Sequence, residues 1–289
     1  MIDSTRIEHN HKVAAYYDET ILVYKYFWSD PNTLSAHAGV WEKGVQTHRE
    51  AHQIGNRMLA ERAALSAQDH VLDAGCGMGG SALWLAETYG ARVVGIALSR
   101  SQLREARRAA LRRRLDHLVT FSRQDYSAMA FEDASFDVVW AFESVCHALC
   151  KRDFLAEAFR VLRPGGRLVM ADYFRSARPL PPDDEKCFHR AVSGSAVRDL
   201  DTPEEFFAAM RDVGFGDISF DDYTDQIERS LRKLYHFALL TLPAAWLVHR
   251  LRLGLVSDVL AQGSISNYYQ HEAGRRKLVP YIVLLAHKP

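Results

Sequence analysis

The chain has 289 residues, of which 48% are hydrophobic, and its 36 basic side chains are balanced by 36 acidic ones. This composition is typical of a globular protein with one large domain, or with one domain and a cap. Because the charges cancel, no long-range field attracts nucleic acid or an anionic membrane, and a nucleic-acid partner is not expected.

The four cysteines show no paired CxxC spacing, and no secretory signal precedes them. We therefore expect a reduced, cytoplasmic protein. Cys146, His147 and Cys150 lie close together in the sequence, but no second cluster of ligands accompanies them, so no metal site is expected.

Aromatic side chains are concentrated at the N-terminal end, where seven of the first 41 residues are Tyr, Phe or Trp, against 11% of the whole chain. We expect residues 1–60 to form a helical segment that packs about half of these rings on the core, as amphipathic helices do. The other rings would form a lid over a binding site. Each ring face attracts a cation by about 0.5–2 kcal/mol.

Residues 71–80 read VLDAGCGMGG, a short apolar strand that runs into a glycine-rich turn and then into a helical pattern. Glycines let a backbone approach a ligand more closely than side chains permit. The spacing Gly75-x-Gly77-x-x-Gly80 suits a nucleotide-like ligand lying across strand ends, and no Gly-Lys-Ser/Thr phosphate loop is present. The alternative is a tight strand–helix turn that binds nothing.

Strand and helix patterns alternate through the core, residues 61–175. Besides the strand before the glycine turn, buried strands are predicted at 92–97, 118–122, 136–141 and 167–171. Helices are predicted at 99–114, with Ser99 as N-cap, and at 152–162, ended by the Arg-Pro-Gly-Gly sequence at 163–166. This alternation predicts right-handed βαβ units and a doubly wound, Rossmann-like α/β sheet.

Residues 176–289 are predicted to supply cap helices and two last strands, 218–223 and 281–287, which makes seven strands in a single domain. The acidic run 183–185 follows three prolines and is expected to be a solvated loop, whereas Thr202 opens a capping box and a helix. Residues 224–262 are helical by pattern. Their most apolar stretch, 237–248, is too short to span a bilayer. The wider apolar part, 234–255, predicts either a hydrophobic substrate wall or the contact of a homo-oligomer.

The D-x-G-x-G turn at Asp73, Gly75 and Gly77, with the helix–L-x-P-G-G–strand pattern at 157–169, resembles the class I S-adenosylmethionine (SAM) methyltransferases. The resemblance implies SAM as cofactor, with Asp73 holding its ammonium group. The turn after strand 92–97 lacks the acid with which many members, and NAD enzymes, grip a ribose. It is similar instead to a subgroup with the pattern G-I-x-L-S-x-x-Q.

In that subgroup the Leu, Ser and Gln of the pattern line the ribose region, and Asp125 resembles the family's contact to the adenine amine. An ordinary loop role for Asp125 is the alternative. The cofactor-binding residues expected from the resemblance are Asp73, Gly75, Cys76, Gly77, Leu98, Ser99, Gln102, Gln124, Asp125, Tyr126 and Phe142.

The sequence after strand 136–141, A-F-E-S-V-C-H-A, resembles the sterol C-methyltransferase signature, with Glu143, Cys146 and His147 aligning, and tocopherol-type methyltransferases are similar there. On a helical turn Glu143 and His147 would share one face. The aromatic N-terminal segment resembles the same sterol group, although some glycine and acidic residues of its signature are missing. The alternative for Glu143 is a hydrogen bond to loop backbone.

These features lead to the hypothesis of SAM-dependent C-methylation of an alkene carbon in an isoprenoid or prenylated natural product, through a carbocation. Glu143 would stabilise the cation or accept its proton, His147 is the alternative acceptor, and Tyr24, Tyr26, Phe27 and Trp28 would form an aromatic wall. The partner expected is thus a hydrophobic small molecule. Hydride shift or cyclisation would be possible later steps.

Two other functions stay open. An O- or N-methyltransferase acting on a small aromatic or polyketide metabolite would use His147 as base, and its rate would fall as a histidine protonates near pH ~6.5. A non-catalytic protein that binds SAM or a terpenoid is the third reading.

Overall fold

A seven-stranded sheet forms the centre of the computed structural model, which describes residues 4–30, 32–250 and 258–289, with the side chains of all of these except 244–250 and 258. The strands are β1 (His70–Ala74), β2 (Arg92–Ala97), β3 (Val119–Arg123), β4 (Phe136–Phe142), β5 (Leu162–Tyr173), β6 (Gly216–Asp222) and β7 (Tyr281–His287). Their order across the sheet is β3-β2-β1-β4-β5-β7-β6.

The first five strands are parallel, and β7 runs antiparallel to both β5 and β6. The strand order reverses between β1 and β4, which is the position where doubly wound sheets bind ligands. The predicted Rossmann-like fold with seven strands is confirmed.

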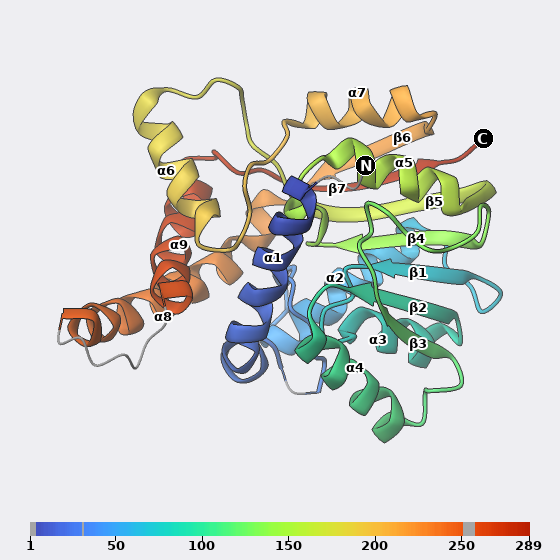
Figure 1. Ribbon diagram of the computed structural model, residues 1–289, viewed down its shortest axis with the longest axis horizontal. Helices are drawn as coiled ribbons and strands as arrows, with labels where there is room; N and C mark the ends of the chain where they lie inside the picture. Colours follow the sequence, from blue (N-terminus) through green and yellow to red (C-terminus); the bar gives the residue numbers. More distant parts are fainter. Residues whose placement is uncertain (1–3, 31, 251–257) are drawn as a thin grey trace.

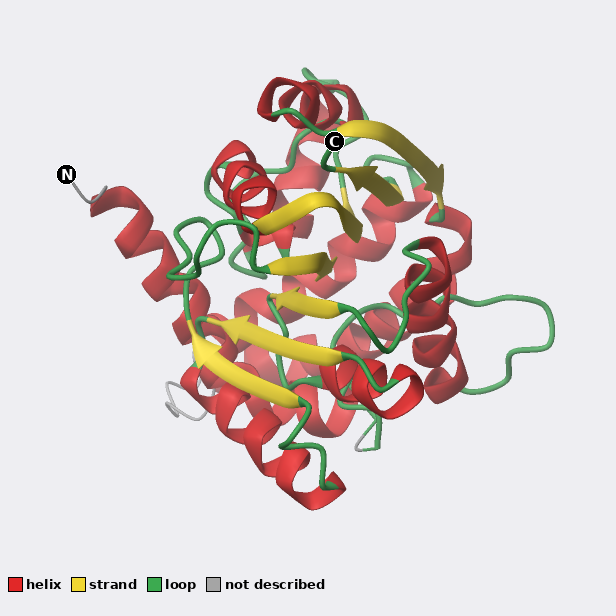
Figure 2. Cartoon of the chain, turned by 90° about the vertical axis from the view of Figure 1, so that its right-hand side faces the viewer, coloured by secondary structure: helices red, strands yellow, loops and turns green. Residues whose placement is uncertain are grey.

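Buried residues on both faces of the central strands explain why helices cover the sheet on two sides (Figure 2). Val71 and Val138 pack with α2 (His48–Arg62), α3 (Gly80–Tyr89) and α4 (Arg100–Arg113). Their neighbours Leu72 and Val139 pack with α5 (Lys151–Val161) and α7 (Pro203–Val213) on the other side. Each fully buried aliphatic side chain contributes about 1.5–3 kcal/mol, so these two layers hold the strand ends in place.

Two predicted helix starts are confirmed by their caps. Ser99 Oγ accepts a hydrogen bond from the N–H of Gln102 at 3.1 Å and begins α4. Thr202 and Glu205 form the reciprocal capping box that begins α7. Caps of this kind contribute about 1 kcal/mol each, and the first one fixes the backbone beside the glycine turn.

Four helices gather beyond the carboxyl ends of the parallel strands (Figure 1). They are α1 (Ser4–Val23), α6 (Pro182–Ser193), α8 (Thr224–Arg250) and α9 (Asp258–Arg275). The helix α1 runs across the strand ends, while α6 follows β5, and α8 and α9 lie between β6 and β7 in the chain. No helix within the described ranges is long and apolar enough to cross a membrane.

The structure corrects the sequence predictions in three places. Strand β5 already begins at Leu162 and carries the Pro-Gly-Gly sequence, because a shift in register between Phe136 and Val138 accommodates it. The acidic run 183–185 lies in the first turn of α6, where Glu185 pairs with Arg175 at 2.7 Å and Asp184 with Arg276 at 3.2 Å. Acids are favoured there by the helix dipole.

The third correction concerns the helix predicted at 224–262, since α9 continues to Arg275. Within the apolar stretch 234–255, the side chains of 244–250 and all of residues 251–255 lie outside the described residues.

Candidate active site

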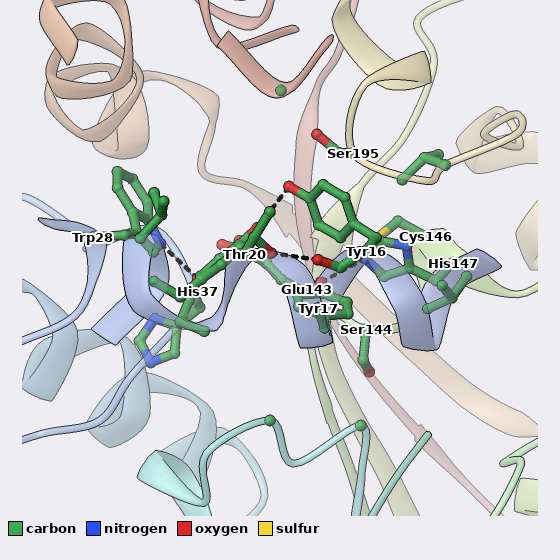
Figure 3. Close-up of a pocket in the computed structure, with 18 of the residues that line it drawn as sticks. Tyr16, Tyr17, Thr20, Trp28, His37, Glu143, Ser144, Cys146, His147 and Ser195 are labelled. Atoms are coloured by element: carbon green, nitrogen blue, oxygen red, sulfur yellow. Dashed lines mark hydrogen bonds between the residues drawn. The ribbon is translucent and has the colours of Figure 1, made fainter. Parts of the chain in front are cut away.

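One cavity of about 730 Å³ lies at the carboxyl ends of β1 and β4, beneath α1 and against α6, α8 and α9. It brings together most of the residues singled out in the sequence. Figure 3 shows Tyr16, Tyr17 and Thr20 of α1 facing the turn after β4 that carries Glu143, Ser144, Cys146 and His147.

The glycine turn forms one end of this cavity. Gly75 has a φ of +98°, and a Cβ placed on it would lie 2.3 Å from Cβ of Ser144. The turns that follow β1 and β4 therefore approach each other more closely than any side chain at position 75 would permit. Gly77, at φ +52°, faces open space except for the amide nitrogen of Gln102 at 3.7 Å.

Asp73 supplies a buried carboxylate at this end. Its Oδ2 has no hydrogen-bond partner among the described residues, and burial raises the pKa of the carboxyl group to about 7. A buried carboxylate without a cation is costly, so the site fits the ammonium group of a SAM-like ligand.

The remaining cofactor-binding residues predicted on the sequence also line the cavity, with one exception. Those that line it are Cys76, Leu98, Ser99, Gln102, Gln124, Tyr126 and Phe142. Asp125 does not. Its carboxylate accepts a hydrogen bond from Asn10 at 2.8 Å and lies 3.6 Å from Arg6, so it faces the start of α1 instead of the cavity.

The N-terminal aromatic segment divides at a single π-helical turn, Tyr24–Trp28. The N–H of Ser29 donates to the oxygen of Tyr24 at 2.8 Å, and this longer hydrogen-bonded loop changes the direction in which the following side chains point. Tyr24, Phe27 and Trp28 line the cavity, whereas Tyr26 is 63% exposed and lies outside it. Tyr26 is therefore not part of the aromatic wall.

Two tyrosines that were not assigned to the site join this wall from α1. Tyr16 and Tyr17 line the cavity beside Tyr24, with ring centroids 5.1 to 6.3 Å apart, and the hydroxyls of Tyr16 and Tyr24 are 3.2 Å apart. Tyr16, Thr20 and Tyr24 recur every four residues, so helical periodicity was the signal that could have found Tyr16, whereas Tyr17 lies outside this series.

Glu143 lines the cavity from the turn directly after β4. Its backbone has a φ of +48°, which is uncommon for a residue with a side chain and recurs at functional sites. The N–H of Ala38 and the hydroxyl of Tyr281 both donate to Oε1 at 2.7 Å. Burial nevertheless raises the pKa of the carboxyl group to about 8.

The prediction that Glu143 and His147 share one face of a helical turn is wrong, because Glu143 is left-handed and only Val145–His147 form a short 3-10 turn. Both side chains still line the cavity. Nε2 of His147 is 2.7 Å from the hydroxyl of Tyr17, and burial lowers the pKa of the imidazole to about 4. His147 is therefore neutral near pH 7.

The cap helices form the wall opposite the strand ends. This wall is apolar along Leu231, Leu234 and Phe237 of α8, and the amides of Asn267 and Gln270 of α9 add polar groups. The lining is thus mostly hydrophobic, with few groups able to bind a hydrophilic ligand. Leu234 and Phe237 place part of the apolar stretch 234–255 in this wall.

A family model described as a methyltransferase domain matches residues 72–170. The O-methyltransferase resE of Aspergillus sclerotiorum is 33% identical over 217 residues, which cover 74% of this chain and 80% of that protein. The sterol 24-C-methyltransferase erg6 of Schizosaccharomyces pombe is 32% identical over 218 residues, which cover 74% of this chain and 56% of that protein.

Among solved structures, the geranyl diphosphate C-methyltransferase from Streptomyces coelicolor A3(2) has the same fold. Its crystal structure, in complex with Mg²⁺, geranyl diphosphate and S-adenosyl-L-homocysteine, aligns with a TM-score of 0.74 at 18% identity and covers 97% of this chain and 98% of that chain.

Fold, glycine turn and buried acid thus define a methyltransferase that takes its methyl group from SAM. The chain belongs to the SAM-dependent methyltransferases, and the predicted resemblance to their sterol group is confirmed.

Proposed function

We propose that this methyltransferase transfers the methyl group of SAM to an alkene carbon of an isoprenoid or prenylated natural product. Relatives of both kinds, O- and C-methyltransferases, match the chain, so the choice rests on the cavity. The single observation that carries the proposal is the carboxyl group of Glu143, set among aromatic rings in a mostly apolar cavity beside the cofactor end.

The chemistry requires little from a base at the moment of attack. SAM supplies an electrophilic methyl group on a sulfonium. The π electrons of the alkene form the new carbon–carbon bond, the sulfur–carbon bond breaks, and S-adenosylhomocysteine is released with the positive charge left on a substrate carbon. Loss of a proton from a neighbouring carbon then restores a double bond; a hydride shift or ring closure before that loss gives other products.

The rings of Tyr16, Tyr17, Tyr24 and Trp28 suit the charged stage of this reaction. Each ring face stabilises a nearby cation by about 0.5–2 kcal/mol, and more where water is excluded. The hydroxyls of Tyr16 and Tyr24 bond each other at 3.2 Å, so these polar groups are at least partly satisfied within the lining. Phe27 adds a ring at the exposed side of the cavity.

Glu143 is proposed as the group that stabilises the cation and accepts its proton, with His147 as the alternative acceptor. With a pKa of about 8 the carboxyl group is mostly protonated near pH 7, so its role as acceptor requires that the positive charge of bound SAM, or of the carbocation, favours the ionised form. The hydrogen bonds from Ala38 and Tyr281 leave Oε2 without a partner among the described residues.

The division of the chain follows from this proposal. Residues 1–60 form the lid, 61–175 the SAM-binding core, and 176–289 the cap with the last strands, all within one domain of residues 1–289. The homo-oligomer expected from the sequence stays a prediction.

The test is incubation of the protein with methyl-labelled SAM and a panel of prenylated alcohols, acids and phenols. We expect label on a former alkene carbon, located by NMR of the product. Label found only on oxygen or nitrogen, with every acceptor of the panel, contradicts the proposal.

A second candidate, O-methylation of a small aromatic or polyketide metabolite, is favoured by the contact of 2.7 Å between Tyr17 and His147. A neutral imidazole in such a contact can take a proton from a hydroxyl acceptor. Because burial lowers the pKa of His147 to about 4, the rate of an O-methylation that uses this base should fall near pH 4 and not near the usual pKa of a histidine. A pH–rate profile with a single limb near that value would favour O-methylation.

A further inference from the structure

Lys233 of α8 is the one lysine or arginine that lines the cavity within the described part of the chain. Two carboxyl groups, of Asp73 and Glu143, line the same cavity, and the histidines there are held neutral by burial. Lys233 is partly buried in this mostly apolar lining, and a charge that loses part of its hydration gains from a partner.

The contacts of Lys233 supply no such partner. Its ammonium group donates to the main-chain oxygen of Trp28 at 3.3 Å and lies 5.4 Å from the centroid of that indole ring. It forms no ion pair with any described residue. Asp30 is the acid whose charge acts on the pKa of Lys233, but its carboxylate already forms an ion pair with Arg49 at 3.1 Å. Two of its three N–H donors are therefore free for a ligand.

Burial lowers the pKa of Lys233, which shows that its charge is incompletely compensated in the ligand-free protein. His48 adds no competing positive charge, since burial lowers its pKa to about 3. An anion bound at Lys233 would satisfy the ammonium group and restore its pKa toward the ordinary value.

Hydrogen bonds through one loop connect the helix that carries Lys233 to Glu143. Ser230, one helical turn before Lys233, accepts a hydrogen bond from the N–H of Gly39 at 3.0 Å. The preceding residue, Ala38, donates to Glu143 at 2.7 Å. The loop through Ala38 and Gly39 thus links the lysine-bearing helix to the proposed reaction centre, with the apolar side chains of Leu231 and Leu234 alongside.

We propose that Lys233 binds an oxyanion, a carboxylate or a phosphate, at one end of the acceptor, so that the substrate class is an amphipathic isoprenoid with an acidic end. The isoprenoid part of this statement rests on the proposed function; the oxyanion part rests on Lys233 alone. The competing explanation is that Lys233 only covers the Trp28 ring with its stem and keeps its charge in solvent.

The test is isothermal titration calorimetry on the protein saturated with S-adenosylhomocysteine. The probes are farnesoic acid, farnesyl monophosphate and farnesol, which share one chain and differ at its end. We expect the acid or the phosphate to bind about tenfold more tightly than the alcohol, as a charge-assisted hydrogen bond would give. Comparison of the acid with the phosphate identifies which oxyanion the site prefers.

Three variants decide the role of the lysine. Lys233→Met should bring the affinities for all three probes together, and Lys233→Arg should retain the preference. Lys25→Met is the matched control, because Lys25 pairs with Glu105 at 2.7 Å outside the cavity, and it should behave as the unaltered protein. Thermal melting of each variant excludes loss of folding.

Equal affinity for the three probes, no binding of any of them, or a preference that survives in Lys233→Met would each overturn the proposal. Failure of the proposed function has a different signature. If the acid binds through Lys233 but is methylated only at its carboxylate oxygen, the oxyanion site stands and C-methylation is wrong.

Discussion

At the scale of single residues, Glu143 combines three features that rarely coincide by chance. Its backbone is left-handed, its half-buried carboxyl group is poorly solvated, and its two hydrogen bonds come from segments far apart in the chain, at Ala38 and Tyr281. Strain and desolvation both cost stability, and such costs are concentrated where function requires them. The bond from the N–H of Ala38 is the contact to loop backbone expected as the alternative, and the strained backbone and the bond from Tyr281 are what it leaves unexplained.

Replacement of Glu143 by Gln tests both the free-energy cost of desolvating the carboxylate and its proposed role as proton acceptor. The folded pKa of about 8 exceeds the ordinary value of 4.5, so the native state holds a proton that the unfolded chain releases between those values. The free energy of unfolding therefore falls as pH rises through that range. Glu143→Gln should raise the melting temperature of the cofactor-free protein at about pH 8.5 and leave it nearly unchanged at about pH 4.5.

The same variant should lower kcat by about 10²-fold, the size expected when a proton acceptor is removed. Glu8→Gln, which alters an exposed carboxylate of α1, serves as the control for both measurements. A melting temperature that does not depend on pH differently in Glu143→Gln would show that the carboxyl group is not strongly perturbed.

Gly75 offers a second prediction at this scale, because the chain contains a matched control. Gly75 and Gly44 have nearly the same φ, +98° and +96°, but a Cβ at Gly44 meets nothing within 4 Å. Gly44→Ala should cost only the backbone strain of about 1–2 kcal/mol. Gly75→Ala adds the clash with Ser144, so we expect a loss at least about 2 kcal/mol larger in urea unfolding. Equal losses would contradict the close approach of the two turns.

At the scale of elements, α1 connects the two halves of the site. Toward the cofactor half, Asp18 accepts hydrogen bonds from the hydroxyls of Ser99 and Ser101, each at 2.6 Å, and from the N–H of Ser101 at 3.0 Å. Toward the acceptor half, Tyr17 contacts His147, and His9 donates to the carbonyl of His147 at 2.8 Å. The position of this helix is therefore tied to the loop that carries Ser99 and to the turn that carries His147.

Asp18→Ala should weaken this connection without harming the core, since Asp18 is itself exposed. We expect the Kd for S-adenosylhomocysteine to rise about fivefold to tenfold, or about 1.0–1.4 kcal/mol, which is less than the full value of the three hydrogen bonds because the donors freed by loss of this exposed carboxylate can bond water instead. Glu19→Ala, an exposed neighbour on α1, is the control and should leave the Kd unchanged. A Kd unaffected by Asp18→Ala would show that α1 does not hold the Ser99 loop.

At the scale of the whole molecule, the sequence predicts the sheet well and the N-terminal aromatic segment poorly. Continuous apolar runs such as 71–74 and 136–141 and caps such as Ser99 are local patterns that can be read from the sequence. Because these runs are buried on both faces, they are expected as central strands of a parallel sheet covered by helices. The glycine turn is equally local, because its spacing reflects the space available to the backbone.

Which side chains of the N-terminal aromatic segment face the cavity could not be predicted, because the direction of each depends on the π-helical turn Tyr24–Trp28. That turn brings Trp28 inward and leaves Tyr26 outside. Contacts between distant segments could not be predicted either. The hydrogen bonds from Tyr281 to Glu143 and from Asn10 to Asp125 do not follow from any spacing along the chain. Lys233 was overlooked because a lysine within a helical pattern ordinarily faces solvent.

The placement of the cap helices in the chain has a consequence for how acceptor preference can change. The donor end is encoded by loops after β1, β2 and β3, whereas α6 follows β5 and the pair α8 and α9 separates β6 from β7. One stretch of polypeptide can therefore be exchanged or remodelled while the other is retained. Chimaeras that replace the segment between β6 and β7 are a direct route to altered acceptors with unchanged use of SAM.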